Sequence, residues 1–185
     1  MTRLVVAVTG ASGSILAVRL LEALAQRDCE VHLVVSDAAQ QTLELETDYK
    51  LDYLASLADR TYSNRDVSAA LASGSFPVTG MVVVPCSVKT LAGIASGYAE
   101  SLILRAADVC LKERRPLILA VRETPLNAIH LDNMLRVTQA GAIVMPPVPA
   151  FYTKPVTVDD ICTQFVGRIL ARFGLSVAGY QVWEG

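Results

Sequence analysis

The stretch Leu4-Val5-Val6-Ala7-Val8 is followed, after one threonine, by Gly10-Ala11-Ser12-Gly13, and these residues decide the fold. A continuous apolar run is typical of a strand that is buried on both faces of a parallel sheet. The small residues after it predict a tight turn into a helix that begins near Ser14. The unpaired N–H groups at the start of such a helix attract an anion, usually a phosphate. The stretch therefore predicts a strand–turn–helix unit that suits a phosphate-bearing ligand.

The glycine spacing in this turn narrows the choice of ligand. Gly10 and Gly13 are present, but the third glycine of the dinucleotide-binding pattern is missing, and Ala17 stands further along. The Lys-Ser/Thr pair of a P-loop is also missing. Turns of this kind occur in many nucleotide and flavin folds and in plain α/β domains. The turn alone therefore favours a phosphate-bearing ligand other than a nucleoside triphosphate.

The rest of the chain alternates between strand and helix patterns. Such alternation predicts one doubly wound α/β domain, residues 1–185, whose parallel sheet is covered by helices on both faces, in three layers. The region 52–79 carries the weakest pattern, and Ser73–Pro77 is expected to be an irregular loop. The expected strands are Leu4–Val8, Val31–Val35, Met81–Pro85, Leu117–Val121 and Ala142–Met145. The expected helices are Ser14–Gln26, Asp37–Leu45, Leu102–Lys112, Leu126–Gln139 and one from Thr157 to about Phe173.

The composition bears on partners and compartment. Apolar residues make up 52% of the chain and charged residues 18%, which predicts a homo-oligomer with buried subunit contacts. No apolar run reaches the length of a membrane span, and the N-terminus lacks the layout of a signal peptide. The net charge of −2 gives no general attraction to nucleic acid or to an anionic membrane.

The cysteines and histidines are few and scattered. The four cysteines show neither metal-ligand spacing nor a secreted disulfide framework, and there are only two histidines. These counts predict a protein of the reducing cytoplasm without a metal site.

Three polar loops are expected at the carboxyl ends of the strands, where α/β folds bind ligands. They are Thr9–Gly13, Cys86–Thr90 and Arg122-Glu123. Because strands of a parallel sheet end at one edge, these loops should converge. They define the candidate site.

Basic residues cluster between Arg105 and Arg122. Arg105 and Lys112 lie seven residues apart, so they share a helix face. The following pair, Arg114 and Arg115, is interpreted as a solvated helix end. Arg122 instead emerges from an apolar strand beside Glu123, which suits an anion-binding arginine.

Seven blocks of sequence together identify a family resemblance. They are Gly10-Ala11-Ser12-Gly13, Leu45-Glu46-Thr47-Asp48, Pro85-Cys86-Ser87-Val88-Lys89-Thr90-Leu91, Arg105-Ala106-Ala107-Asp108-Val109, Lys112-Glu113-Arg114-Arg115-Pro116-Leu117, Arg122-Glu123-Thr124-Pro125-Leu126 and Pro146-Pro147-Val148-Pro149-Ala150-Phe151-Tyr152. In order and spacing, the chain resembles the UbiX flavin prenyltransferases from about Leu4 to Trp183. That family includes members once called phenylacrylic acid decarboxylases.

The resemblance implies a flavodoxin-like, Rossmann-type FMN protein that attaches a dimethylallyl group to reduced FMN, first at N5 and then at C6. The donor would be dimethylallyl monophosphate, or the pyrophosphate used by some relatives. The product, prenylated FMN, would serve a UbiD-type decarboxylase. Family members are commonly dodecamers, so the expected homo-oligomer would be a dodecamer.

The resemblance also implies roles for individual residues. Phosphate of the prenyl donor would be bound without a metal by Arg105, Lys112, Arg122, Tyr152 and Arg168, while Asp159-Asp160 is interpreted as a helix cap. FMN would be bound by Gly10, Ala11, Ser12, Gly13, Ser36, Ser87, Val88, Lys89, Thr90 and Arg122. Catalytic roles would fall to Ser12, Glu46, Lys112, Glu123 and Trp183.

Some roles stay open at this point. The proton released on ring closure could go to Glu46, to Glu123 or to the departing phosphate. Each glutamate could also be a simple ion-pair partner. The tail 174–185 would fold over the active site and present Trp183 to an allylic cation, or it would anchor to a neighbouring subunit. The chain departs from many relatives at Ser14-Ile15-Leu16 and at Ala17, which puts the pocket shape beyond Ser12 in doubt.

Two other functions are weighed against this one. The first is an FMN-dependent cysteine decarboxylase of the same broad fold, which would need a catalytic histidine and a Pro-x-Met-Asn motif. Here the loop reads Pro85-Cys86-Ser87-Val88, and neither His32 nor His130 lies in a convincing catalytic loop. The second is a non-catalytic FMN-binding accessory subunit of an aromatic acid decarboxylase, which would not need Lys112, Tyr152 and Arg168 together.

Overall fold

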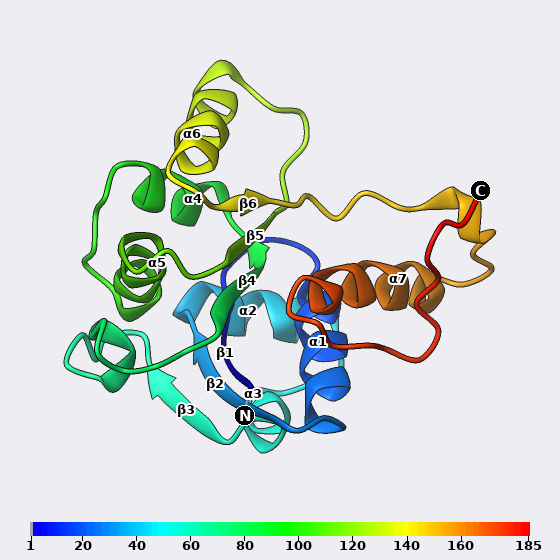
Figure 1. Cartoon of the computed structure of the whole chain (residues 1–185), viewed down its shortest axis with the longest axis horizontal. Helices are drawn as coiled ribbons and strands as arrows, with labels where there is room; N and C mark the ends of the chain where they lie inside the picture. Colours follow the sequence, from blue (N-terminus) through cyan, green and yellow to red (C-terminus); the bar gives the residue numbers. More distant parts are fainter. Residues whose placement is uncertain (1) are drawn as a thin grey trace.

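The chain forms one six-stranded parallel sheet with helices on both faces (Figure 1). The computed structural model describes residues 2–185. Neighbouring strands follow the order β3-β2-β1-β4-β5-β6, so the doubly wound prediction is confirmed. The strands are β1 (Thr2–Val8), β2 (Cys29–Val35), β3 (Arg60–Ser63), β4 (Gly80–Cys86), β5 (Leu117–Val121) and β6 (Ile143–Val144).

The helices divide into two layers, one on each face of the sheet. The first layer contains α1 (Ser14–Ala25), α2 (Asp37–Glu46), α3 (Leu51–Ser56) and α7 (Val158–Ala171). The second layer contains the short helix η1 (Ala70–Ala72), α4 (Val88–Ala95), α5 (Leu102–Lys112) and α6 (Ala128–Gln139).

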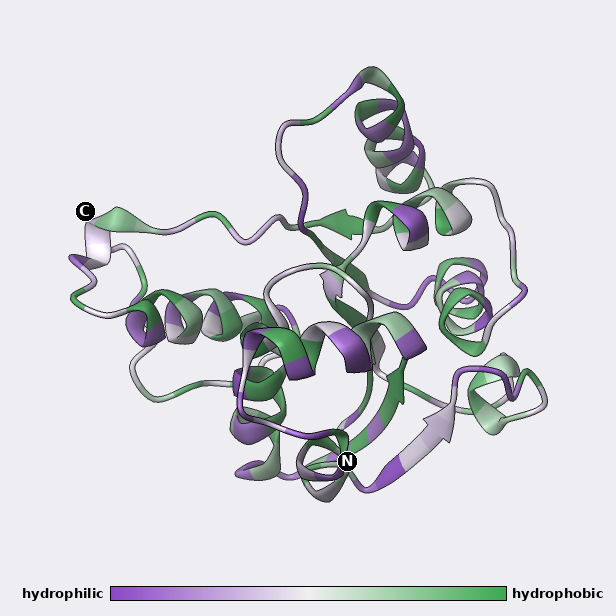
Figure 2. Ribbon diagram, turned by 180° about the vertical axis from the view of Figure 1, so that it is seen from behind, coloured by the Kyte–Doolittle hydropathy of each residue, from purple (hydrophilic) through white to green (hydrophobic). Residues whose placement is uncertain are grey.

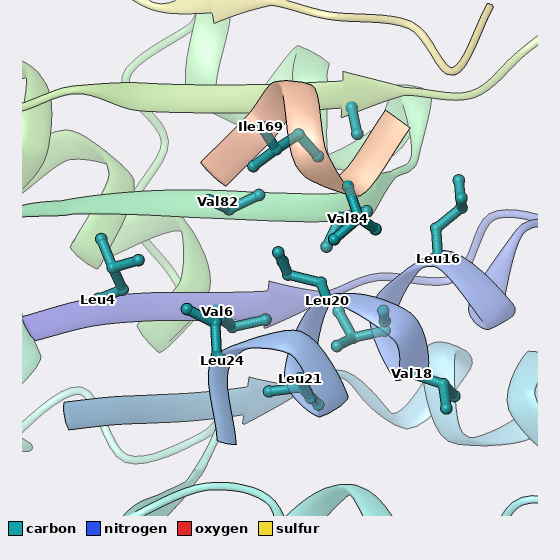
Figure 3. Packing of buried hydrophobic residues seen from close by; sticks show 14 of the residues in the cluster. Leu4, Val6, Leu16, Val18, Leu20, Leu21, Leu24, Val82, Val84 and Ile169 are labelled. Atoms are coloured by element: carbon teal, nitrogen blue, oxygen red, sulfur yellow. The ribbon is translucent and has the colours of Figure 1, made fainter. Parts of the chain in front are cut away.

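The strand β1 supplies side chains to both cores because successive residues of a strand point to opposite faces. Leu4 and Val6 pack under the first layer, together with Leu20 of α1 and Ile169 of α7 (Figure 3). Val5 faces the second layer. Burial on both faces explains why β1 is a continuous apolar run rather than an alternating one.

The strand order reverses between β1 and β4. The chain runs outward from β1 through β2 to β3, then returns to add β4 on the other side of β1. The connections on the two sides cross opposite faces, so the loops after β1 and β4 diverge. In open α/β sheets the crevice at such a point is the usual ligand site.

Three elements differ from the expectations. The region 52–79, whose pattern was the weakest, contains most of α3 and all of β3, and the expected loop after β4 continues directly into α4. The strand β3 was missed because it is an edge strand with three of its four residues exposed, so it carries no apolar pattern. Figure 2 shows this strand in hydrophilic colours. The segment Ser73–Pro77 is irregular, as expected.

A long extended segment follows β6 and leads away from the sheet (Figure 1). We call residues 146–157 the arm; it contains the short helix η2 (Phe151–Thr153). The helix α7 returns to the sheet, and the tail 174–185 then runs back to end beside η2. Between residues 2 and 185, no helix is both long and apolar enough to cross a membrane.

Candidate functional site

Thr9 ties together the loops that follow β1 and β4. Its hydroxyl donates to the carbonyl oxygen of Pro85 over 2.8 Å and accepts from the N–H of Ser87 over 2.8 Å. The side chain is only 2% exposed, so both bonds are shielded from water. The two loops are therefore held at a fixed separation on either side of the crevice.

The loops after β2 and β5 lie next to this pair. The N–H of Ser36 donates to the carbonyl oxygen of Val8 over 3.0 Å, and the N–H of Arg122 donates to that of Cys86 over 3.0 Å. The carboxyl edge, where the strands end, thus brings together the segments expected to bind FMN. From β2 to β5 they are Ser36, Gly10–Gly13, Ser87–Thr90 and Arg122.

Two of these hydroxyls cap helices that start at the edge. The Ser36 oxygen accepts from the N–H of Ala39 over 3.1 Å at the start of α2. The Ser87 oxygen accepts from the N–H of Thr90 over 3.2 Å at the start of α4, and the two hydroxyl oxygens lie 3.0 Å apart. Val88, Lys89 and Thr90 are thus the first turn of a helix, not a loop. The remaining unpaired N–H groups of these turns favour an anion at this edge.

The start of α1 is occupied by the chain's own carboxylate. Glu46, the last residue of α2, accepts from the N–H of Gly13 over 2.9 Å and from that of Ser14 over 3.0 Å. Gly13 adopts a φ of 106°, which only glycine reaches readily and which aims both N–H groups the same way. In this structure these two N–H groups are thus paired with a carboxylate of the same chain.

These bonds set the charge of Glu46. Partial burial works to raise its pKa, but hydrogen bonds from the Ser12 side chain and from the N–H groups of Ser14 and Gly13 outweigh it, and the pKa lies below its ordinary value. Glu46 is therefore ionised at neutral pH. It lies at the rim of an open hollow of about 570 Å³, lined also by Ile15, Thr47, Asp48 and Tyr49.

The donors at this edge fit a flavin nucleotide. Ser14 buries a hydroxyl oxygen that has no hydrogen-bond partner among the described residues. Gly10 approaches α2 so closely that a Cβ there would lie 2.5 Å from the Cβ of Ala38. Hydroxyl groups, helix N-termini and a bare arginine around one crevice can bind a phosphate together with the polar rim of a flavin ring.

Arg122 and Glu123 are both exposed at this edge. Arg122 takes part in none of the ion pairs formed within residues 2–185. The Glu123 carboxylate accepts from the N–H of Thr124 over 3.0 Å. Arg122 is thus an exposed cation at the carboxyl edge, without an ion-pair partner among residues 2–185.

Arg105 and Lys112 lie on α5, away from Arg122. Arg105 donates to the carbonyl oxygen of Ala72 over 3.1 Å and forms an ion pair with Asp108. Lys112 ends α5 and pairs with Glu113, against Gly74. Since β5 begins a few residues later, Lys112 lies at the amino edge of the sheet. The five residues of β5, about 16 Å of strand, separate that edge from Arg122.

The interpretation of Arg114 and Arg115 holds for only one of them. Arg114 is exposed with a φ of 57°, as at a solvated helix end. Arg115 instead donates to the carbonyl oxygens of Phe76 over 2.9 Å and Gly74 over 2.7 Å. It anchors the irregular loop beside Lys112, because two backbone carbonyls there need donors.

Tyr152 and Trp183 form a third group, on the arm and the tail. Their rings meet edge to face with centroids 5.4 Å apart. Tyr152 also accepts a hydrogen bond over 3.0 Å from Gln164 of α7, a residue that the sequence did not single out. Arg168 follows Gln164 by four residues, so it projects from the same side of the helix. The tail thus contacts α7 and η2 of its own chain rather than folding over that chain's carboxyl edge.

The residues expected to bind the donor phosphate therefore fall into three separate groups within one chain. The first is Arg122 at the carboxyl edge, the second is Arg105 and Lys112 on α5, and the third is Tyr152 on the arm with Arg168 on α7. A single phosphate cannot reach all three in an isolated chain. The sequence placed Thr9 in the candidate loop Thr9–Gly13 but did not show its link to the loop after β4, and it did not single out Gln164.

Comparisons with known proteins agree with this architecture. The family described as Flavoprotein matches residues 1–170. A protein of Escherichia coli K12 named flavin prenyltransferase UbiX is 51% identical over 188 residues, which cover 100% of both chains.

Two solved structures extend this likeness to the whole fold. AnUbiX (PadA1), in complex with FMN and dimethylallyl pyrophosphate, superposes with a TM-score of 0.97 at 50% identity, over 100% of this chain and 98% of that one. A dodecameric FMN-dependent UbiX-like decarboxylase from Escherichia coli O157:H7 also gives a TM-score of 0.97 at 50% identity, over 100% of both chains. With the crevice, its donors and the two edges arranged as described, the chain belongs to the Flavoprotein family and, within it, to the UbiX-type flavin prenyltransferases.

Proposed function

We propose that this chain is a flavin prenyltransferase, which moves a dimethylallyl group from dimethylallyl monophosphate, or from the pyrophosphate, to reduced FMN. The observation that carries the proposal is the full-length superposition on a relative that holds FMN and dimethylallyl pyrophosphate together. The donors at the carboxyl edge support it. When bound, reduced FMN supplies N5 and C6, the atoms that accept the prenyl carbons.

We assign FMN to the crevice between β1 and β4. The first turn of α4 and the capped start of α2 offer N–H and hydroxyl groups, and Arg122 offers positive charge. Ser12 lies at the turn next to Glu46, where it would face the flavin ring. Gly10, Ala11 and Gly13 would line the same side of the crevice.

We assign the prenyl donor's phosphate to the basic residues and to Tyr152. Departure of that phosphate leaves a developing negative charge, which preorganised cations and hydroxyl donors stabilise strongly. Arg105, Lys112, Arg122 and Arg168 can supply that charge without a metal ion. The aromatic face of Trp183 could stabilise the allylic cation on the other side of the breaking bond.

We assign the proton-accepting role to Glu46. Because its pKa is lowered, the carboxylate stays ionised throughout the neutral range, which is the form that can accept a proton or stabilise positive charge. Glu123 is engaged with a neighbouring backbone N–H and remains the second candidate, with the departing phosphate as the third.

We propose that active sites form between copies of the chain. The three groups of phosphate residues would meet only if the amino edge or the arm of one copy approached the carboxyl edge of another. The exposed apolar residues of the arm, the start of α7 and the tail support such contacts: Val148, Phe151, Val156, Val158, Val182 and Trp183. The dodecamer formed by the E. coli O157:H7 relative is the assembly that we expect here.

Val156→Asp should break this assembly. Val156 is 92% exposed in the single chain, so a charge there costs the isolated fold little but cannot be buried in an interface without a partner. We expect light scattering to show smaller species and circular dichroism to stay unchanged. Val67→Asp, which replaces an exposed valine outside the arm, is the control. A full-size assembly of the Val156 variant would contradict the role of the arm.

The product would be consumed by a UbiD-type decarboxylase. We expect the protein to work in the cytoplasm, where reduced flavin and thiols are maintained.

The cysteine decarboxylase alternative is disfavoured by full-length identity to named prenyltransferases. The same identity disfavours a non-catalytic FMN-binding role.

The discriminating experiment incubates the purified oligomer anaerobically with reduced FMN and dimethylallyl monophosphate. Mass spectrometry of the released flavin should show the added dimethylallyl group, and the absorbance spectrum should differ from that of FMN. FMN recovered unmodified with both donors would support a binding-only role and overturn the proposal. The pyrophosphate, tested in parallel, ranks the donors.

A further inference from the structure

Gln164 is a polar residue in a buried position of α7. Gln164 is only 5% exposed, and the next two residues along the helix, Phe165 and Val166, are buried apolar residues. A buried amide is costly unless its donors and acceptor are paired. The partners of this amide therefore show what the residue is for.

The amide of Gln164 is locked in one orientation by the tail. Its nitrogen Nε2 donates to the carbonyl oxygen of Gln181 over 2.8 Å, and its oxygen Oε1 accepts from the N–H of Gln181 over 2.9 Å. Rotating the amide by half a turn would place Oε1 against the carbonyl oxygen of Gln181 and Nε2 against the N–H of Gln181, so neither hydrogen bond could form. The orientation of the amide is thus fixed by the N–H and C=O groups of Gln181, whose donor and acceptor roles cannot change.

This orientation fixes the hydrogen of Tyr152. The second N–H of Nε2 donates to the tyrosine oxygen over 3.0 Å, and an amide nitrogen can only donate. The tyrosine oxygen must therefore accept, which leaves its own hydrogen free for another acceptor. Tyr152 is 41% exposed, so a bound group can reach that hydrogen. Accepting one bond also makes the hydroxyl a stronger donor for the next.

The same contacts hold Trp183 in place. Its ring packs edge to face on Tyr152. The tail before it lies so close to α7 that a Cβ at Gly167 would collide with Tyr180. Glycine at 167 and the amide at 164 therefore fix the tail along one side of α7, with Trp183 at its end beside the tyrosine.

We propose that Gln164 is a positioning residue for the prenyl donor. It turns the Tyr152 hydroxyl outward as a hydrogen-bond donor to an anionic phosphate oxygen, and it holds Trp183 beside that hydroxyl before the substrate binds. The identity of the anion rests on the proposed function, whereas the docking of the tail does not. Arg168, on the same side of α7, adds positive charge to this place.

Tail docking can be measured without any substrate, because Trp183 is the only tryptophan of the chain. Gln164→Met keeps the length of the side chain but removes all three hydrogen bonds. We expect acrylamide to quench Trp183 fluorescence more strongly in this variant than in the wild type. Gln139→Met, at the exposed end of α6, should leave quenching unchanged, as should Tyr152→Phe, which keeps the ring.

Kinetics then test the hydroxyl. We expect Gln164→Met and Tyr152→Phe each to raise KM for dimethylallyl monophosphate on the order of tenfold, with FMN affinity unchanged. Gln164→Glu should raise KM further, because a carboxylate would capture the tyrosine hydrogen and would face the carbonyl oxygen of Gln181. If Gln164 only stabilised the fold, KM would not rise in this order, with Gln164→Glu above Gln164→Met and Tyr152→Phe.

The outcomes separate this inference from the proposed function. Wild-type KM in Tyr152→Phe, or unchanged quenching together with wild-type KM in Gln164→Met, overturns the inference while prenyl transfer by the wild type still stands. A wild-type oligomer that produces no prenylated FMN overturns the proposed function and the phosphate half of this inference. Increased quenching in Gln164→Met, with raised KM in both variants, supports it.

Discussion

Glu46→Gln lowers the single-turnover rate of prenylated FMN formation about 10²–10⁴-fold, the usual contribution of a general acid–base group. Glutamine keeps the shape of the side chain and one acceptor for the N–H groups of Gly13 and Ser14, so FMN should still bind. What it loses is the charge and the ability to take a proton. The rate is measured by stopped-flow absorbance, when enzyme loaded with reduced FMN is mixed with the prenyl donor.

The matched control is Glu44→Gln, an exposed glutamate on the same helix, which should leave the rate unchanged. If Glu46→Gln forms product at the wild-type rate, Glu46 is only a helix cap. The proton would then go to Glu123 or to the released phosphate.

The stability of the Glu46 variant depends on pH in a way that separates the two roles. The carboxylate at the start of α1 stabilises the fold by about 0.3–1 kcal/mol while it is charged. Its folded pKa lies below the ordinary 4.5, so this stabilisation is fully present above that value and is lost as pH falls through the folded pKa. Denaturant unfolding should therefore show a gap between wild type and variant at pH 7 that closes in acid.

Mixed oligomers of Lys112→Ala and Arg122→Ala chains recover activity that neither variant has alone. Each variant should lose binding and departure of the donor phosphate, because each removes a cation from the site. Lys112 and Arg122 lie at opposite edges of the sheet, so a shared site takes them from different copies. With random mixing of equal amounts, about a quarter of such sites receive both native residues.

Denaturing and refolding the two variants together, then measuring activity per chain, tests this expectation. The double variant Lys112→Ala, Arg122→Ala mixed with wild type serves as the control for assembly. No recovery in mixtures that assemble to full size would mean that both residues act within one chain, against the separation of the edges.

The sequence predicted the buried strands and the long helices well. β4, β5 and residues 4–8 of β1 are apolar because both faces of the sheet are covered, and α5 matched its expected bounds. Patterns failed where burial was one-sided or absent. The edge strand β3 is mostly exposed, and α4 follows a strand without an intervening loop.

The site was only partly predictable for a similar reason. Spacing placed Arg122 and Ser87 at one edge because strand ends converge. It could not show that Glu46 would reach back to the start of α1, since two connections and a strand separate them. Gln164 gave no signal at all, because a single glutamine in an amphipathic helix is usually a solvated residue.

The Glu46 carboxylate at the start of α1 also bears on which nucleotides the protein can bind. In a dinucleotide-binding fold, the pyrophosphate is placed at the N-terminus of the helix that follows the first strand. Here that place already carries a negative charge, supplied by Glu46 and held by the N–H groups of Gly13 and Ser14. A pyrophosphate at this position would meet like charge instead of bare donors. We therefore expect this charge to disfavour dinucleotides by repulsion, so that a single phosphate would bind at the starts of α2 and α4 instead.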